Sequence, residues 1–329
     1  MRELRYAEAL HESLVSEMRR DPRVVVFGED IGIYGGVFKV TKDLQQEFGA
    51  ERVRDTPIAE EAIVGLAIGS SMMGLRPVCE IMYVDFLPLA LDQLINQASL
   101  MQYIWAGQVQ LPFVLRTQGG AGGAAGAQHS KSLEAIVAHI PGLKVVMPAT
   151  PADAKGLLTA SIRDPNPVVF IEHKMLYNTR GPVPEGEHLV PLGVADIKRP
   201  GGDVSIVATS RMVLEALRAA EELERDGVSA EVVDVRTLRP LDVATIVASV
   251  KRTHRAVVVN EGWRTGGFGA ELAAVIAEEA FSYLDAPVQR LGAADLPVPY
   301  SPGLEPASVP DAAAIARAAR SALRAADLV

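Results

Sequence analysis

Short apolar runs alternate with helix-like patterns along the first half of the chain. Nearly continuous Val, Ile and Leu predict strands over residues 23–30, 76–86, 111–118, 143–149 and 166–173. Apolar residues at helical spacing predict helices over about 1–22, 58–74, 88–106, 131–139 and 151–163. Strands that are apolar at almost every position and separated by helices are typical of a parallel sheet with both faces covered.

A break in this pattern spans residues 178–202, which hold four prolines, five glycines and no long periodic segment. Beyond it the alternation resumes, with strands predicted over 203–210, 229–238, 255–262 and 287–293 and helices over 213–226, 242–251, 269–283 and 311–326. The chain is therefore predicted to form two α/β domains, residues 1–185 and 203–329, joined by a linker at 186–202.

Length and composition exclude several classes of protein. A chain of 329 residues is too long for one ordinary core, which agrees with two domains. A formal net charge of −9 argues against nucleic acid as the main partner, because phosphate contacts need clustered Lys and Arg. The single cysteine, Cys79, excludes an internal disulfide framework and indicates a reducing compartment. No apolar run reaches the roughly 20 residues that a membrane-spanning helix requires.

The glycine-rich segment "GGAGGAAGAQHS" (119–130) admits three interpretations. Gly120, Gly122 and Ala125 fit the dinucleotide pattern G-x-G-x-x-A, but the next predicted helix starts only at residue 131 and the strand after it lacks a terminal acid. A flexible surface loop is the second interpretation. We favour a third, in which the glycines let the backbone approach a ligand and bring His129 to it.

Four longer segments occur in an order and at a spacing that resemble a known family. They are "GEDIGIYGGVFKVT" (28–41), "DTPIAEEAIVG" (55–65), "AQHSKSLEAIVAHIPGLKVVMPATPADAKGLL" (127–158) and "VRTLRPLD" (235–242). Over nearly the whole chain, the sequence resembles the beta subunit of the decarboxylating first component of 2-oxo acid dehydrogenase complexes. The resemblance implies two transketolase-like α/β domains: a mainly parallel domain that binds the pyrimidine of thiamine diphosphate (1–185) and a C-terminal transketolase-like domain (203–329).

The resemblance assigns Glu60 to the cofactor. In this family the aminopyrimidine of thiamine diphosphate, as its imino tautomer, takes a proton from the thiazolium carbon and makes it a nucleophile. A buried carboxyl group bonded to the far ring nitrogen favours that tautomer by sharing a proton with it. Glu60 matches this glutamate, and Ile58 matches a residue that packs against the cofactor. On the residues alone, Glu60 and Glu61 are better explained as acids that complement the dipole of a helix whose later residues look fully buried.

Further site residues follow from the same resemblance. His129 matches a histidine beside the reacting carbon, expected to bind substrate or move a proton during transfer of the acyl group to lipoamide; a structural histidine is the alternative. Glu29 and Asp92 match acids that join Glu60 in a proton relay between two active sites, and Glu29 also lies at the cofactor. A surface salt bridge is the alternative for Asp92. Phe86 matches an aromatic residue that flanks the pyrimidine.

A potassium ion is a further implication of the resemblance. In some members of the family the ion is held by a segment that matches "SIRDPNP" (161–167). Its ligands would be the backbone oxygens of Phe113, Ser161 and Ile162, together with Asp164 and Asn166. The same Asp-Pro-Asn-Pro run is also simply a favourable turn sequence.

The diphosphate half of such a site is missing from the chain. Thiamine enzymes hold the diphosphate and Mg²⁺ with a Gly-Asp-Gly segment followed by paired asparagines, and this sequence contains neither. The resemblance therefore implies an alpha subunit that supplies this half in an α2β2 heterotetramer. The C-terminal domain is expected to contact the second beta subunit and to dock the lipoyl-bearing dihydrolipoamide acyltransferase, with Asp295 as an acidic candidate.

The expected reaction is oxidative decarboxylation of a 2-oxo acid, preferably pyruvate, with reductive acylation of lipoyl-lysine. Acetoin and branched-chain 2-oxo acids are alternative substrates, because Leu89 stands where pyruvate-type members can carry glutamine and "RTGGFGAEL" (264–272) resembles the branched-chain type. A non-catalytic nucleotide-binding module is the alternative of a different class. The expected location is the cytoplasm of a bacterium, or the mitochondrial matrix of a eukaryote.

Overall fold

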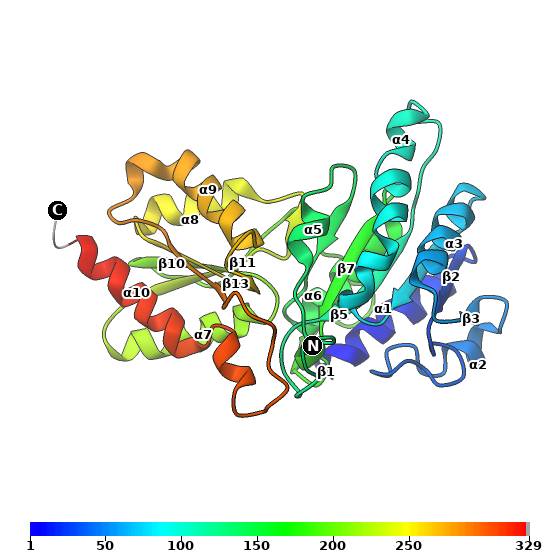
Figure 1. The fold of residues 1–329 in the computed structure, drawn as a ribbon, viewed down its shortest axis with the longest axis horizontal. Helices are drawn as coiled ribbons and strands as arrows, with labels where there is room; N and C mark the ends of the chain where they lie inside the picture. Colours follow the sequence, from blue (N-terminus) through cyan, green and yellow to red (C-terminus); the bar gives the residue numbers. More distant parts are fainter. Residues whose placement is uncertain (327–329) are drawn as a thin grey trace. The chain divides into compact units, whose positions relative to one another are not determined.

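The computed structural model of the protein describes residues 1–326. Their contacts divide the chain into two compact units, each with its own sheet (Figure 1). The first unit contains residues 1–119 and 136–192, and the second contains residues 120–135 and the chain from Gly193 onward.

A parallel sheet forms the core of the first unit. Within this unit the strands follow the order β6–β7–β5–β4–β2–β3, and every neighbouring pair runs parallel. The central strands carry apolar residues at most positions and are almost wholly buried, which confirms the parallel sheet predicted from the apolar runs. The bounds are β2 Val24–Gly28, β3 Val53–Asp55, β4 Arg76–Ile81, β5 Val114–Gly119, β6 Lys144–Val146 and β7 Val168–His173.

Helices cover this sheet. α1 (Tyr6–Arg20) packs against α6 (Pro151–Arg163), and α3 (Glu60–Met72) packs against β4. α6 begins where the pattern predicts, because the Thr150 hydroxyl accepts the backbone N–H of Asp153 at 3.2 Å. The shorter helices are α2 Leu44–Phe48, α5 Glu134–Ala138 and the 3₁₀ helix η3 Lys174–Leu176.

The predicted strand 76–86 and the predicted helix 88–106 are wrong in extent. The predicted strand 76–86 is too long, because after β4 the backbone turns and the Phe86 N–H donates to the Tyr83 carbonyl at 2.8 Å. The predicted helix 88–106 is broken, and Pro88, which lacks an N–H to donate, lies inside the first piece. The pieces are the 3₁₀ helix η1 Val84–Ala90, the π-helix η2 Gln93–Ala98 and α4 Met101–Ile104.

Four short described strands, β1, β3, β8 and β9, lie where none is predicted; β3 (Val53–Asp55) pairs parallel with β2. β1 (Arg2–Arg5) pairs antiparallel with β8 (Arg180–Val183), so the predicted helix over 1–22 starts only at Tyr6. β8 and β9 (Asp196–Arg199) both lie in the proline-rich break. Such strands are stabilised by pairing with distant segments, and a local apolar pattern therefore does not reveal them.

The second unit is built on a five-stranded sheet in the order β14–β13–β10–β11–β9, parallel except for the edge strand β9. α7 and α10 pack against each other, and α8 packs against α9 (Figure 1). The bounds are β10 Val204–Ala208, α7 Met212–Arg225, β11 Ala230–Asp234, β12 Thr237–Arg239, α8 Val243–Thr253, β13 Ala256–Trp263, α9 Phe268–Ala280, η4 Phe281–Tyr283, β14 Gln289–Ala293, η5 Glu305–Ser308 and α10 Ala312–Ala326.

The division between the units falls next to Gly193, inside the predicted linker 186–202. One segment departs from the predicted domains: residues 120–135, which follow β5, group by their contacts with the second unit. The reason is that acidic side chains of the second unit bind its backbone N–H groups.

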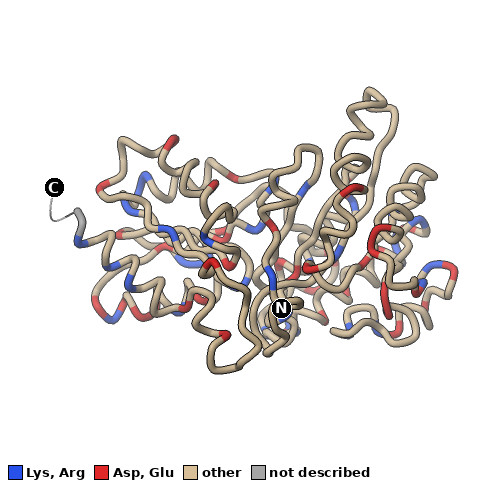
Figure 2. Tube along the Cα trace, in the orientation of Figure 1, with Lys and Arg blue, Asp and Glu red and all other residues tan. Residues whose placement is uncertain are grey.

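Charged residues of both signs are intermingled along the chain (Figure 2). Among the described residues, every helix is too short or too polar to span a bilayer.

Candidate active site

Charged side chains on three neighbouring parallel strands form a buried network in the first unit. Glu80 on β4 lies beside Arg116 on β5, and Glu172 lies on the next strand, β7. The Arg116 guanidinium donates to Glu80 at 2.5 Å and to Glu172 at 2.7 and 2.9 Å. The Tyr177 hydroxyl donates to Glu172 at 2.5 Å, and the Gln118 amide donates to Glu80 at 2.7 Å. One buried guanidinium therefore compensates two carboxylates only in part, and burial raises the pKa of Glu172.

A second buried group, Glu29 and Glu60, is purely acidic. Glu29 follows β2 and is 5% exposed; Glu60 opens α3 and is 6% exposed. One Glu29 oxygen accepts the backbone N–H of Met82, whereas Oε1 has no hydrogen-bond partner among the described residues. Burial, and then the nearby charge of Glu60, raises the pKa of Glu29 to about 7. The two acids are thus electrostatically coupled, and near neutral pH a proton on Glu29 relieves their repulsion.

The backbone places Glu29 next to this network through a close approach at Gly28. Gly28 pairs with Glu80 in the parallel register of β2 and β4. A Cβ atom added to Gly28 would lie 2.4 Å from the Glu80 carbonyl oxygen, so only glycine fits there. Glu80 in turn contributes to the raised pKa of Glu29, although less than burial and Glu60 do.

The two glutamates at the start of α3 differ in their surroundings. Glu60 is buried, whereas Glu61 is exposed and accepts a hydrogen bond from the Gln93 amide at 3.2 Å. The helix is not fully buried as its sequence suggests: one face is open, with Gly65, Leu66 and Gly69 exposed. The apolar composition of α3 therefore reflects a surface that can meet a partner, as well as the core beneath it.

The other predicted cofactor contacts lie at or near the surface of the first unit. Ile58 is 81% exposed just before α3, and Phe86 is half-buried on η1, which packs against α3. Leu89, at the position where the sequence departs from pyruvate-type members, is exposed. Asp92 is also exposed and accepts a hydrogen bond from the Asn96 amide at 2.6 Å, four residues along the same segment.

The predicted potassium ligands gather around the carboxyl end of α6, where cationic side chains already bind several of them. The Arg76 guanidinium donates to the Ile162 carbonyl at 2.8 Å, and the Lys144 ammonium binds the Asp164 carboxylate at 2.5 Å. Asn166 donates its amide to the same carboxylate at 2.9 Å. The carbonyls of Phe113 and Ser161 accept backbone N–H groups at 3.0 and 3.2 Å. The oxygen donors suit a hard cation, but protein cations already supply positive charge there.

His129 belongs to the second unit. It lies in the glycine-rich segment, half-buried, and its backbone N–H donates to the Gly126 carbonyl at 3.3 Å. Before His129, the carboxylates of Glu261 and Glu305 accept backbone N–H groups of the segment. After His129, the Lys131 carbonyl accepts the Gly120 N–H at 2.9 Å. The favoured interpretation of this segment, a backbone support that brings His129 to a ligand, stays a prediction.

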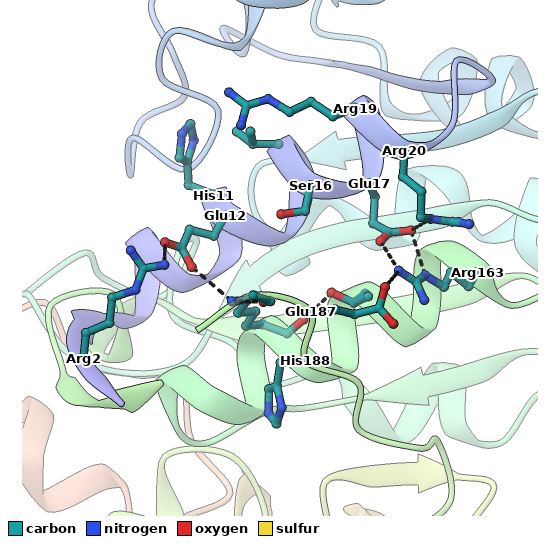
Figure 3. A pocket seen from close by; sticks show the side chains of 14 residues that line it. Arg2, His11, Glu12, Ser16, Glu17, Arg19, Arg20, Arg163, Glu187 and His188 are labelled. Carbon is teal, nitrogen blue, oxygen red and sulfur yellow. Dashed lines mark hydrogen bonds and ion pairs between the residues drawn. The ribbon is translucent and has the colours of Figure 1, made fainter. Parts of the chain in front are cut away.

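A separate cavity of about 510 Å³ lies between α1, α6 and the segment around Glu187 (Figure 3). Its charged side chains already form ion pairs: Glu12 binds Arg2 and Lys155, and Arg163 binds Glu187 and the α1 residue Glu17. None of the predicted cofactor residues lines this cavity. The glutamates that line it already bind cations, so it offers no arrangement comparable to the Glu29–Glu60 pair.

Comparison with known proteins identifies the family. The transketolase pyrimidine-binding domain matches residues 2–180, and the transketolase C-terminal domain matches residues 193–315. A mitochondrial pyruvate dehydrogenase E1 component subunit beta-2 from Oryza sativa subsp. japonica is 46% identical over 325 residues, covering 98% of this chain and 86% of that protein. The chain belongs to the transketolase-like family of E1 beta subunits. This membership confirms the two transketolase-like α/β domains that the resemblance implies.

Other relatives of the family agree. A pyruvate dehydrogenase E1 component subunit beta from Porphyra purpurea is 49% identical, covering 92% of this chain and 91% of that protein. A solved structure described as a split gene transketolase, inactive beta4 tetramer, superposes with a TM-score of 0.78 at 24% identity, covering 97% and 98% of the two chains. That likeness shows the fold alone. The family leaves no support for a separate nucleotide-binding module.

Several residues of these sites are absent from the sequence-based predictions. Glu80, Arg116 and Glu172 are not among the predicted site residues, although Glu80 and Glu172 each lie near the carboxyl end of a strand and Arg116 lies inside the strand between them. Because the carboxyl ends of parallel strands meet at one edge of a sheet, that spacing is the signal that could have found the two glutamates. Glu261, near the carboxyl end of β13, carries the same signal, whereas Glu305 does not, because its contact depends on a distant loop.

Proposed function

We propose that the chain is the beta subunit of a thiamine diphosphate-dependent 2-oxo acid dehydrogenase first component that acts on pyruvate. The product acyl group would pass to lipoyl-lysine. Relatives that are pyruvate dehydrogenase E1 beta subunits, similar over nearly the full length, support the substrate class. The observation that carries the proposal is the buried Glu29–Glu60 pair with its unpaired carboxylate oxygen.

The residues of the first unit fit the pyrimidine of the cofactor. When bound, thiamine diphosphate supplies a carbon nucleophile for the 2-oxo group and accepts the charge left by loss of CO₂. Glu60 would share a proton with the pyrimidine ring nitrogen, and its burial excludes water that would compete for that bond. Ile58 is exposed and available for apolar contact with the ring, and Phe86 would flank it.

Glu29 would hold the proton that Glu60 exchanges. Its pKa of about 7 lets it both accept and release a proton near neutral pH, which a relay requires. Asp92 is proposed as the next member of the relay, reached only within the assembled protein. Its exposed position in the single chain is compatible with contact to a second subunit.

His129 is proposed to bind the substrate oxygen or move a proton during acyl transfer to lipoamide. Imidazole is suited to this because its unperturbed pKa lies near physiological pH. Its place on a loop fixed at several backbone positions supports a role that needs defined orientation.

An alpha subunit is proposed to complete the site. The sequence lacks Gly-Asp-Gly and paired asparagines, and the described residues contain no group of three or more metal-binding side chains, so Mg²⁺ and diphosphate ligands would come mainly from that subunit. The exposed apolar face of α3 supports a protein partner. We propose an α2β2 heterotetramer.

The second unit is proposed to dock the lipoyl-bearing dihydrolipoamide acyltransferase. Its candidate residue, Asp295, is exposed, but its carboxylate accepts hydrogen bonds from the Thr265 backbone and hydroxyl at 3.2 and 2.6 Å. These bonds lower the pKa of Asp295, so it would face a basic partner as a fixed anion. Relatives are named mitochondrial or chloroplastic; a bacterial cytoplasm or a mitochondrial matrix remains our prediction for this chain.

A substrate panel tests the proposal. The chain is co-expressed with its candidate alpha subunit, and the purified assembly is assayed with pyruvate, acetoin and branched-chain 2-oxo acids. We expect the largest kcat/KM with pyruvate and an absolute need for thiamine diphosphate. Preference for acetoin would move the chain to the acetoin-cleaving relatives, and activity without thiamine would refute the proposal.

A further inference from the structure

The glycine-rich segment that carries His129 has an unusual backbone. Gly120, Gly122, Gly123 and Gly126 all have positive φ, and Ala124, which has a Cβ atom, also lies in the left-handed region at φ 53°. A segment of this kind has many accessible conformations when it is free, and the conformation of Ala124 is strained. External contacts must therefore select the conformation observed.

Two buried acids of the second unit provide these contacts. Glu305, at the start of η5, accepts the Gly122 N–H on Oε1 at 2.7 Å and the Ala124 N–H on Oε2 at 2.8 Å. Glu261, on β13, accepts the Ala121 N–H at 2.5 Å. Both acids are less than a tenth exposed. Bonds from N–H groups to a buried carboxylate are stronger than neutral ones, and water competes with them little.

The Glu305 contact needs a carboxylate in particular. Its two oxygens bind N–H groups two residues apart, and one of these belongs to the strained Ala124. A glutamine has a single oxygen, and its NH₂ group would face one of the two N–H donors. Because Glu305 binds backbone N–H groups and not side chains of the loop, it constrains the path of the loop directly.

Other contacts extend this support toward His129. A Cβ atom on Gly126 would lie 3.1 Å from the Tyr300 ring, so the loop packs closely there. After His129, Glu134 accepts a hydrogen bond from the Asn260 amide at 3.3 Å. His129 is thus carried on a short span whose two ends are fixed by groups of the same unit.

We propose that Glu305 is a positioning residue for His129: by binding the N–H groups of Gly122 and Ala124 it fixes the loop in the conformation required for acyl transfer. The inference rests on the proposed role of His129. Glu305 itself touches neither substrate nor cofactor in this proposal. Its loss should therefore lower the rate of acyl transfer and leave proton sharing at Glu60 largely intact.

The test compares three variants of the assembled tetramer: Glu305→Gln, His129→Ala and the double variant. The matched control is Glu278→Gln, which changes an exposed glutamate on α9. Decarboxylation is measured with an artificial electron acceptor, and reductive acylation is measured on a lipoyl domain. We expect Glu305→Gln to slow acylation about 10–100-fold, as for a catalytic group displaced by about 1 Å, with less than about a 3-fold change in decarboxylation. The double variant should acylate the lipoyl domain no more slowly than His129→Ala, because both substitutions remove the same function, that of His129.

Two further measurements separate positioning from general stability. Hydrogen exchange of the 120–135 segment should be faster in Glu305→Gln, with the midpoint of thermal unfolding and tetramer assembly unchanged. Adding Ala124→Gly, which removes the strain at φ 53°, should restore part of the lost acylation rate. If Glu305→Gln fails to assemble, Glu305→Asp, which keeps the charge but shortens the reach, is measured in the same way.

The outcomes distinguish this inference from the proposed function. Unchanged acylation in His129→Ala would refute the proposed role of His129, whatever Glu305 does. Three results would refute the positioning role alone. The first is a normal acylation rate and normal hydrogen exchange in Glu305→Gln, and the second is an equal loss of rate in decarboxylation and acylation. The third is a double variant whose loss of acylation rate is the product of the two single losses.

Discussion

Two groups of buried carboxylates lie in the first unit, and they differ in what neutralises them. Glu80 and Glu172 share the guanidinium of Arg116, with every contact between 2.5 and 2.9 Å. Glu29 and Glu60 have no cation among their interactions, and a Glu29 oxygen has no hydrogen-bond partner among the described residues. The first group has a buried counter-ion that binds β4, β5 and β7 together. The second leaves an acid poised to exchange a proton, which is what cofactor chemistry needs and what folding alone would not favour.

The largest expected effect tests the acidic pair. Glu60→Gln in the assembled tetramer should lower decarboxylation about 10²–10⁴-fold, because an amide cannot share a proton with the pyrimidine in the same way. Steady-state rates with pyruvate measure it, with Glu61→Gln as the matched control on the exposed side of the same helix turn. Undiminished turnover in Glu60→Gln would remove this residue from the mechanism.

Breaking the compensated group should instead damage stability. Arg116→Met leaves Glu80 and Glu172 buried without a cation, so the free energy of unfolding should fall by about 3–5 kcal/mol. Urea unfolding followed by circular dichroism measures the loss. Arg19→Met, which breaks an exposed pair with Glu47, is the control and should have far less effect. Equal losses in the two variants would show that the buried network is not structurally important.

The raised pKa of Glu29 predicts a pH-dependent stability. Because the folded protein binds this proton more tightly than the unfolded chain, Glu29 should cost stability as pH rises from about 4.5 through about 7. Relative to Glu29→Gln, the wild-type protein should lose roughly 1–3 kcal/mol between pH 5 and pH 8. Urea unfolding of both proteins across this range provides the measurement. Parallel pH curves would contradict the raised pKa of Glu29.

The smallest effect concerns potassium. We keep the proposal that potassium binds at Phe113, Ser161, Ile162, Asp164 and Asn166, in competition with Lys144 for the Asp164 carboxylate. Replacing choline chloride by potassium chloride at equal ionic strength should raise the Tm by no more than about 2 °C, and by more in Lys144→Met. Thermal unfolding of both proteins tests this. If potassium leaves the Tm of both proteins unchanged, the ion is removed from the proposal.

Some of the site could be predicted because the chain carries it locally. Glu29 and Glu60 stand at the ends of a predicted strand and helix, so the motifs that contain them are contiguous. The partners of Arg116 come from strands far apart in the sequence, and no local pattern specifies which strand lies next to which. The exposed face of α3 was also missed, since an apolar helix on a subunit surface has the same composition as one in a core.

The sequence by itself determined the α/β alternation, the parallel character of the sheets and the segments that mark the family, because apolar periodicity and motif spacing are written along the chain. The tertiary structure alone decided strand order, which buried acids have a counter-ion, and that residues 120–135 belong with the second unit. The physical reason is that burial and hydrogen bonding depend on distances between remote residues, and those distances exist only once the chain has folded.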